Sequence, residues 1–305
     1  MISREPVRFT YLGQRQQGIA LMQVLLISLI LTVFSLYFSL SSRQQVAIAQ
    51  LADDKALAYL HLLSAENQLK LQLVTRDWNR RGGLEGLPQQ YNLFGEPFAI
   101  NDHVEVTLQD TSGLLGIRYP DQDTLRNLII QKGYDSSVAY RFVDSLMDWQ
   151  DSQNTHTQPR YALSPDQYPL PPRRQFVSFS QELKQIGGID PALGEYLSRW
   201  LLANKVNYFN PLLAPEPVLS AYLGYAADEL VALRKTHRLS SREFSRLTAM
   251  YEQEGRLFTP SQQVKVDLIA RYGEVELHKQ MQLHFFPYAQ RYDSPIHHLY
   301  TLWSP

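Results

Sequence analysis

The sequence predicts an α+β protein in which a long N-terminal helix, transmembrane in its first third, packs on an antiparallel sheet, and a large all-α domain is inserted between the strands. Three observations predict this fold. The chain carries no charged residue between Arg15 and Arg43. Neither proline nor glycine occurs from Arg43 to Arg81. Two groups of residues with the period-two alternation of strands flank a block of helical patterns.

The first part of the long helix is predicted to cross a membrane. Ile19–Leu40 is mostly apolar, and at ~1.5 Å rise per residue such a helix matches the ~30 Å hydrocarbon core of a bilayer. The run is longer than the apolar core of a secretory signal, and the small residue Gly18 precedes it instead of following it. Three arginines stand on its N-terminal side (Arg4, Arg8 and Arg15), so the positive-inside rule predicts a cytoplasmic N-terminus and an exported remainder.

One face of the predicted span carries hydroxyl groups. Ser28, Thr32, Ser35 and Ser39 recur at steps of four, three and four, so they share a helix face. Small polar residues allow helices to approach closely in lipid, which favours a span that packs against other helices. The alternative is that each hydroxyl only satisfies the backbone of its own helix.

The helix is predicted to continue beyond the membrane to residue 81, where Gly82-Gly83 supplies a stop signal. It would then be ~60 residues and roughly 90 Å long. A helix with a kink or break near Ser41–Gln45 is the alternative. Glu66 and Lys70 are placed away from its apolar face. That face is predicted from residues at roughly helical spacing, namely Val46, Ala49, Ala56, Leu60, Leu63, Leu71, Val74 and Trp78.

Strand patterns occur on both sides of a helical block. Before it, Phe98–Ile100 leads to Val104–Leu108, and Leu114–Tyr119 is predicted to return as another strand after a turn at Asp110–Gly113. A sheet of these strands alone would be marginal, so they are expected to pair with the later group. That later group reads as an antiparallel meander of Gln263–Tyr272, Glu274–Phe285 and His297–Trp303.

The block between the strands is predicted to be helical and faintly resembles SAM-like or helix-hairpin-helix units. Its candidate helices are Thr124–Lys132, Ser136–Gln150, Ser178–Gln185, Pro191–Ala203, Pro215–Tyr222, Asp228–His237 and Ser240–Glu254. The predicted organisation is a leader (1–18), the transmembrane part of the helix (19–41), its exported part (42–81), an α/β head (82–119 and 258–305) and the inserted helical domain (120–257).

Composition excludes several kinds of function. The net charge is −1 at pH 7, whereas nucleic-acid binding favours a basic surface, so no nucleic-acid partner is expected. With no cysteine, the chain has no thiol nucleophile, iron–sulfur ligation or cysteine-bound zinc. Neighbouring strand residues point to opposite faces, so His297 and His298 do not share a metal ion. Common hydrolase, zinc-protease and phosphate-loop motifs do not occur, and no enzymatic activity is expected.

The chain resembles minor pseudopilin K of type II secretion, within the type IV pilin-like superfamily. Gly18 followed by Ile19-Ala20-Leu21 is similar to a prepilin peptidase site, and Leu146–Asp151 is similar to the family's Asp-Trp-x-Asp segment. Phe179–Leu183 resembles its Ser-x-x-Glu-Leu helix start, and Val106–Tyr119 its strand–Asp–x–x–Gly–strand element. The chain departs from the family at Gly116–Arg118 and at Val206–Pro211, where the family commonly has asparagine-rich stretches.

The resemblance implies a structural role and a pilin-like fold. Prepilin peptidase would cut between Gly18 and Ile19, and Ile19 would become a methylated N-terminus. The subunit would remain in the inner membrane of a Gram-negative bacterium with its bulk in the periplasm. There it would assemble with I-type and J-type minor pseudopilins at the tip of the pseudopilus.

Gln23 also agrees with the resemblance. Most pilin-like subunits have Glu at the fifth residue after the cut, and that carboxylate pairs with the amino terminus of a neighbouring subunit. K-type subunits typically lack it, because a subunit at the tip has no subunit ahead of it, and an unpaired carboxylate in lipid costs several kcal/mol. Gln23 is therefore predicted, with the hydroxyl face, to take part in helix packing.

Calcium is the only cofactor with support. Some relatives bind it, and calcium requires hard oxygen ligands. Asp148 and Asp151 are the candidate ligands, but they lack the further acids of a complete site, and helix capping also explains them; no cofactor is expected to be required. Two other functions stay open: a single-pass periplasmic receptor or enzyme with an uncleaved anchor, and a minor pilin of a type IV pilus.

Overall fold

The structure, a computed structural model, describes residues 17–76, 87–88, 90–151, 173–187, 189–204, 207–236, 239–286, 289 and 293–304. The predicted leader up to residue 16, the helix stop at Gly82-Gly83 and the loop 152–172 lie outside these ranges. The chain divides into two units, Met1–Ala56 and Leu57–Pro305.

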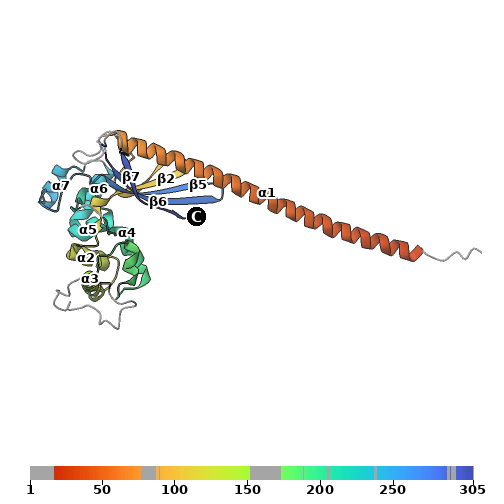
Figure 1. Cartoon of the computed structure of the whole chain (residues 1–305), viewed down its shortest axis with the longest axis horizontal. Coiled ribbons are helices and arrows are strands. Elements are labelled where there is room, and N and C mark those ends of the chain that lie inside the picture. The colour runs from red at the N-terminus through yellow and green to blue at the C-terminus, as the bar shows by residue number, and fades with distance from the viewer. Residues whose placement is uncertain are drawn as a thin grey trace, which may run out of the picture. The chain divides into compact units, whose positions relative to one another are not determined.

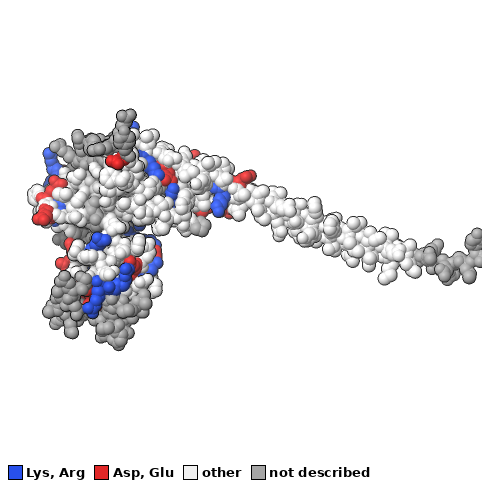
Figure 2. Space-filling view, viewed as in Figure 1, with Lys and Arg blue, Asp and Glu red and all other residues white. Residues whose placement is uncertain are grey.

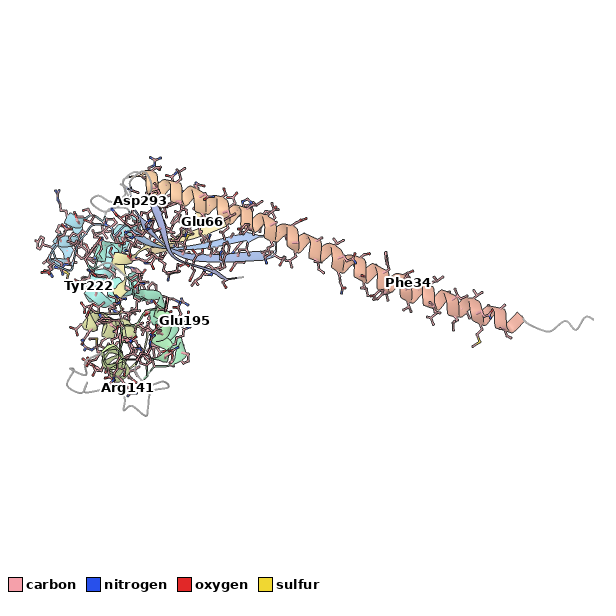
Figure 3. The ribbon with its side chains drawn as sticks, in the orientation of Figure 1. Phe34, Glu66, Arg141, Glu195, Tyr222 and Asp293 are labelled. Atoms are coloured by element: carbon pink, nitrogen blue, oxygen red, sulfur yellow. The ribbon has the colours of Figure 1, made fainter. Side chains whose placement is uncertain are left out.

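The first unit is the N-terminal part of helix α1, which runs from Gln17 to Thr75 without interruption at Ser41–Gln45. Its apolar side chains are exposed, as for Phe34 (Figure 3). Figure 2 shows the outer length of this helix free of Lys, Arg, Asp and Glu, in agreement with the uncharged sequence between Arg15 and Arg43. Within the described chain, α1 holds the one stretch long and apolar enough to cross a membrane, with a mean hydropathy of 2.5 in its most apolar window.

The second unit contains a five-stranded antiparallel sheet (Figure 1). β2 pairs along its whole length with β5, from Val104 opposite Ala270 to Asp110 opposite Val264. Two strands before the helical block therefore lie beside three strands after it, which makes the block an insertion, as the predicted fold class requires. In spatial order the strands are β1 (Phe94–Asn101), β2 (Val104–Asp110), β5 (Gln263–Tyr272), β6 (Val275–Phe285) and β7 (Ile296–Ser304).

The C-terminal part of α1 packs on one face of this sheet, through a stripe that includes Val74 but otherwise differs from the predicted one. Leu60 and Leu71, placed on the packing face by their spacing, are 60% and 61% exposed. Two faces of the helix carry apolar residues at helical spacing, so spacing alone does not choose between them. The face that the sheet covers consists of Ala58, Leu62, Ala65, Leu69 and Leu73, together with Glu66.

The predicted strand Leu114–Tyr119 is wrong in its length and its partner. Only Leu115–Gly116 forms a strand, β3, and it pairs in parallel with β4 (Leu201–Leu202) in a separate two-stranded sheet. The reason is a short 3-10 helix at Thr111–Gly113, capped by the Asp110 side chain. It turns the chain out of the large sheet before a third strand could form beside β2.

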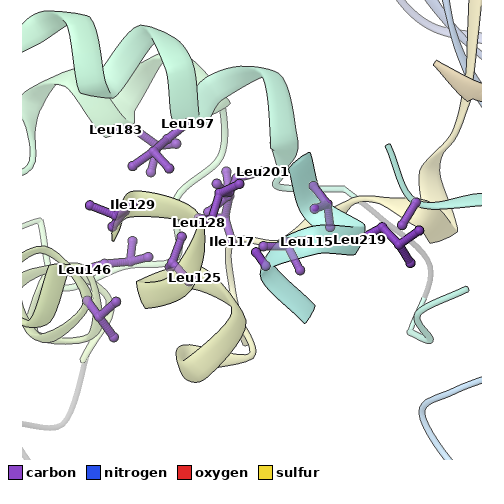
Figure 4. Packing of buried hydrophobic residues seen from close by; sticks show 14 of the residues in the cluster. Leu115, Ile117, Leu125, Leu128, Ile129, Leu146, Leu183, Leu197, Leu201 and Leu219 are labelled. Atoms are coloured by element: carbon purple, nitrogen blue, oxygen red, sulfur yellow. The ribbon is translucent and has the colours of Figure 1, made fainter. Parts of the chain in front are cut away.

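The inserted domain has its own hydrophobic core. Figure 4 shows part of it, with Leu125, Leu128 and Ile129 of α2 near Leu146 of α3 and Leu197 of α4. The predicted helix at Ser178–Gln185 is a 3-10 helix at Ser180–Gln185. In the part of the domain that the structure describes, the α-helices are α2 (Gln122–Gln131), α3 (Ser136–Gln150), α4 (Pro191–Trp200), α5 (Glu216–Leu223), α6 (Ala227–Lys235) and α7 (Ser241–Thr248).

The last predicted helix, Ser240–Glu254, is shorter than expected. α7 begins after the capping side chain of Ser240 and ends at Thr248, because Ala249 adopts the left-handed conformation with φ 55°. A left-handed residue at this position terminates a helix. The chain then forms a turn in which the N–H groups of Gln253 and Arg256 each donate to the carbonyl oxygen of the other residue.

Candidate assembly site

The predicted processing residues lie in the first turn of α1. The helix begins at Gln17, so the backbones of Gly18 and Ile19 are helical, and the Ile19 side chain is exposed. The leader that a peptidase would remove lies outside the described residues. Cleavage between Gly18 and Ile19 therefore stays a prediction.

The polar residues of the span are exposed on α1. The Ser28 hydroxyl donates to the Leu25 carbonyl oxygen at 2.9 Å, and the Thr32 hydroxyl donates to the Ser28 carbonyl oxygen at 2.7 Å. These bonds satisfy both hydroxyls within the helix, so they would carry little penalty in lipid. The face stays small enough for a second helix to approach. Ser35, Ser39 and Gln23 are also exposed, and their role in helix packing stays a prediction.

The candidate calcium ligands lie at the end of α3. Asp148 is in its last turn, and Asp151 follows the helix, with its N–H donating to the Asp148 carbonyl oxygen at 3.2 Å. Among the described residues, no three or more histidine and acidic side chains gather as metal ligands do. Residues 152–172, which follow Asp151, lie outside the described ranges, and calcium binding stays a prediction.

A polar network that the sequence analysis missed joins α1 to the sheet. Glu66 is buried where α1 lies on the sheet (Figure 3). One of its carboxylate oxygens accepts from Lys279 Nζ of β6 at 2.6 Å, and the other accepts from Lys70 Nζ at 2.6 Å. Burial opposes ionisation, but the two lysines outweigh it and hold the pKa of Glu66 below its ordinary value of 4.5.

Both lysines also contact residues of β7. Lys279 Nζ lies 4.6 Å from the centroid of the Trp303 ring, a cation–π contact, and Lys70 Nζ lies 3.2 Å from His298 Nε2. Two signals in the sequence indicate this network. Glu66 and Lys70 are four residues apart on a helix, and Lys279 falls in the buried register of a strand between Leu277 and Met281.

A second buried carboxylate lies where the sheet meets the inserted domain. Asp110, at the end of β2, accepts from the N–H and hydroxyl of Ser112 at 2.8 and 2.5 Å, and from the N–H of Ser261 at 2.9 Å. Its complete burial outweighs these bonds and raises its pKa above the ordinary value. Ser112 precedes the insertion and Ser261 follows it. Asp110 therefore forms hydrogen bonds to both of the segments that connect the sheet to the inserted domain.

The inserted domain also covers the β1 end of the sheet. Arg234 of α6 is buried, and its guanidinium donates to the carbonyl oxygens of Ala214 and Pro211 at 2.6 and 2.8 Å. The same guanidinium lies 5.0 Å from the centroid of the Phe94 ring in β1. Burial lowers the pKa of Arg234 to about 10.

A cleft of about 920 Å³ lies between the sheet and the inserted domain. Its lining includes Tyr208, Phe209 and Tyr222 from the insertion and Leu299 from β7. The Phe209 and Tyr222 rings stand edge to face, 5.0 Å apart, and the Tyr208 hydroxyl donates to the Thr259 carbonyl oxygen at 3.1 Å. This part of the wall is aromatic and the Tyr208 hydroxyl is already bonded, so an apolar side chain fits here. The rest of the lining is more polar and includes the charged residues Arg118, Asp121, Glu254 and Arg256.

The comparisons with known proteins concern the fold. No family model matches the chain, and a search of curated proteins also gives no match. Among solved structures, the chain is similar to a chain of the GspK-GspI-GspJ complex from the type 2 secretion system of enterotoxigenic Escherichia coli. The TM-score is 0.51 at 17% identity, with 87% of this chain and 99% of that chain covered. The chain thus shares its α+β fold, a long helix packed on an antiparallel sheet with an added helical block, with a chain of this type 2 secretion complex.

Proposed function

We propose that the chain is a minor pseudopilin of a type II secretion system, a structural subunit and not an enzyme. The observation that carries the proposal is one uninterrupted helix that is uncharged and exposed near its N-terminus and packed on an antiparallel sheet near its C-terminus. The fold that it shares with a chain of the GspK-GspI-GspJ complex supports the same assignment.

The proposed mechanism begins with processing in the inner membrane. Prepilin peptidase removes residues 1–18, and Ile19 becomes the methylated N-terminus. Residues 19–41 stay in the bilayer, where the face of Ser28, Thr32, Ser35 and Ser39 packs against helices of partner subunits. The head and the inserted domain lie in the periplasm and assemble with I-type and J-type minor pseudopilins.

The subunit is proposed to occupy the tip of the pseudopilus. Gln23 supports this position, because a subunit with no neighbour ahead needs no carboxylate to pair with that neighbour's N-terminus. The inserted domain supports it as well, because the α-helices of its described residues, added to the head, would obstruct a further subunit.

Mass spectrometry of the membrane-extracted protein tests the processing step. The proposal expects an N-terminus at Ile19 with a methyl group in cells that contain the peptidase. Gly18→Ala should leave most of the chain unprocessed, whereas the matched control Gly13→Ala, within the leader, should not. An intact Met1 in the wild-type protein would favour the uncleaved receptor or enzyme over a pseudopilin.

Substitution of Gln23 tests the tip position. In a subunit without a neighbour ahead, Gln23→Glu places an unpaired carboxylate in lipid at a cost of several kcal/mol, so assembly with the I-type and J-type subunits should fall sharply. Gln23→Leu should assemble normally. Co-purification from detergent extracts measures both variants, and normal assembly of Gln23→Glu would contradict the tip position.

A further inference from the structure

Strand β7 ends the sheet with an edge that is unusually open to pairing. It pairs with β6 along one side, and the part of the chain that the structure describes places no strand on the other side. The segment Ile296–Ser304 contains no charged residue and no proline. Three of its large side chains are about half exposed: Leu299 (47%), Leu302 (49%) and Trp303 (48%). An uncharged, apolar edge strand is a template for pairing with another chain.

The opposite edge of the same sheet is protected in the ordinary way. β1 contains Glu96 and Pro97, and its pairing with β2 has two irregularities of register. Arg234 of the inserted domain covers its Phe94 ring. Proline, charge and irregular pairing are the usual means of preventing strand addition. Because β1 has all three and β7 has only one irregularity, the difference between the edges indicates a use for β7.

The irregularity in β7 brings the edge beside the cleft. Tyr300 pairs with Gln282 and His298 pairs with Leu283, so Leu299 is the extra residue of the bulge. Leu299 lines the cleft of about 920 Å³ that also holds Tyr208 and Phe209. Strand addition takes its affinity from main-chain hydrogen bonds and its specificity from pockets for alternate side chains. The edge of β7 offers the main-chain hydrogen bonds, and the cleft offers a pocket for a side chain.

We propose that the free edge of β7, at Tyr300–Ser304, binds an extended strand from the head of another minor pseudopilin, and that an apolar side chain of this strand enters the cleft beside Leu299. The inference rests on the proposed function, since it names the surface through which the subunit meets its partner. The partner strand is neutral and apolar, to match an edge without charge.

The direction of α1 argues against a second copy as the occupant. The Tyr59 ring lies 5.8 Å from the Trp303 ring, and Lys70 lies beside His298, so this part of α1 runs antiparallel to β7. In a two-fold pairing of identical antiparallel edges, the two helices would run in opposite directions. Their N-terminal ends would then lie at opposite ends of the pair, which does not suit two subunits anchored in one membrane.

The test uses the full chain in detergent, alone and after co-expression with the I-type and J-type subunits of the same secretion system. Hydrogen–deuterium exchange of the peptide that spans β7 should slow at least tenfold in the complex, while that of β1 should not change. A photo-cross-linking residue at Leu302 should capture one of the two partners, and one at Ala99 of β1 should not. In a second series the photo-cross-linking residue replaces Leu299. In that series Leu302→Lys should lower the yield of the cross-link to the partner about tenfold, and the control Ile130→Lys on α2 should not lower it.

Three results would overturn the inference. The complex could form with β7 exchange unchanged, the cross-link could join two copies of this chain, or Leu302→Lys could leave both binding and exchange at the wild-type level. Each of these leaves the proposed function standing. If the wild-type chain captured neither subunit and kept Met1, the proposed function would fail first and the inference with it.

Discussion

The ion pair of Glu66 and Lys279 offers the sharpest test of how α1 is held on the sheet. Both side chains are buried and their charged atoms are 2.6 Å apart. Replacing Glu66 by Leu leaves the Lys279 ammonium buried without its carboxylate, and breaking a buried pair in this way costs about 3–5 kcal/mol. The Trp303 ring 4.6 Å from Lys279 Nζ offsets part of this cost. The expected loss of unfolding free energy is therefore about 3 kcal/mol.

Thermal unfolding of the full chain in detergent, followed by tryptophan fluorescence, measures the loss. For a domain of this size a loss of ~3 kcal/mol corresponds to a fall in Tm of roughly 6–12 °C. The double variant Glu66→Leu/Lys279→Met should recover most of that fall, since an apolar pair of similar volume replaces a buried ion pair at little cost. The exposed pair Arg271–Glu276, with 2.7 Å between its charged atoms, is the matched control, and Arg271→Met should cost below ~1 kcal/mol.

Two outcomes would refute this reasoning. One is a Glu66→Leu variant within about 1 kcal/mol of the wild type, a difference usual for an exposed pair. The other is a double variant no more stable than the single one, which would mean that lost packing and not the unpaired lysine causes the effect. The pH dependence gives a further check. Because the pKa of Glu66 is lowered in the folded protein, its contribution is complete above pH ~5 and declines as the pH falls through the folded value.

The other predictions concern the junction between the sheet and the inserted domain, at Asp110 and Gly113, and the candidate calcium ligands Asp148 and Asp151. Because burial raises the pKa of Asp110, the folded state binds the proton of Asp110 more tightly than the unfolded state does. The stability of the wild type relative to Asp110→Asn should therefore decrease as the pH rises from 4 to 7. Urea unfolding of both proteins at the two pH values measures this difference, and an increase in it would contradict the prediction. Gly113→Ala should cost about 2 kcal/mol or more in the same assay, because the added Cβ would clash with the Leu213 carbonyl oxygen. A variant of wild-type stability would disprove the close approach. EDTA should leave the Tm unchanged, since no cofactor is expected to be required. A fall that calcium reverses, and that Asp148→Asn removes, would instead establish a calcium site.

The strands and the insertion were largely predictable from the sequence. Gln263–Tyr272 was predicted with the bounds that β5 has, and the meander of β5, β6 and β7 was confirmed. Period-two alternation is a local property, so it identifies a strand without knowledge of its neighbours. The pairing of the two strand groups followed from the instability of a sheet with too few strands.

The candidate site was less predictable, because its residues act through partners distant in the sequence. Helical spacing placed Glu66 away from the predicted packing face, yet it is buried opposite Lys279. The predicted strand at Leu114–Tyr119 became a short strand beside Leu201, which is far away in the chain. Local spacing marks Lys279 as a buried lysine, but it does not show which distant segment either residue meets.

The sequence by itself determined that this protein has a long N-terminal helix with an uncharged span and a head that contains an inserted helical domain. It did so because apolar length and hydrophobic period are written along the chain. Only the tertiary structure decided which face of α1 is buried and which carboxylates lose their contact with water. It also decided that β7 lies beside a cleft and, among the described residues, pairs with a strand on one side only. These features depend on contacts between segments far apart in the chain, and local periodicity does not encode them.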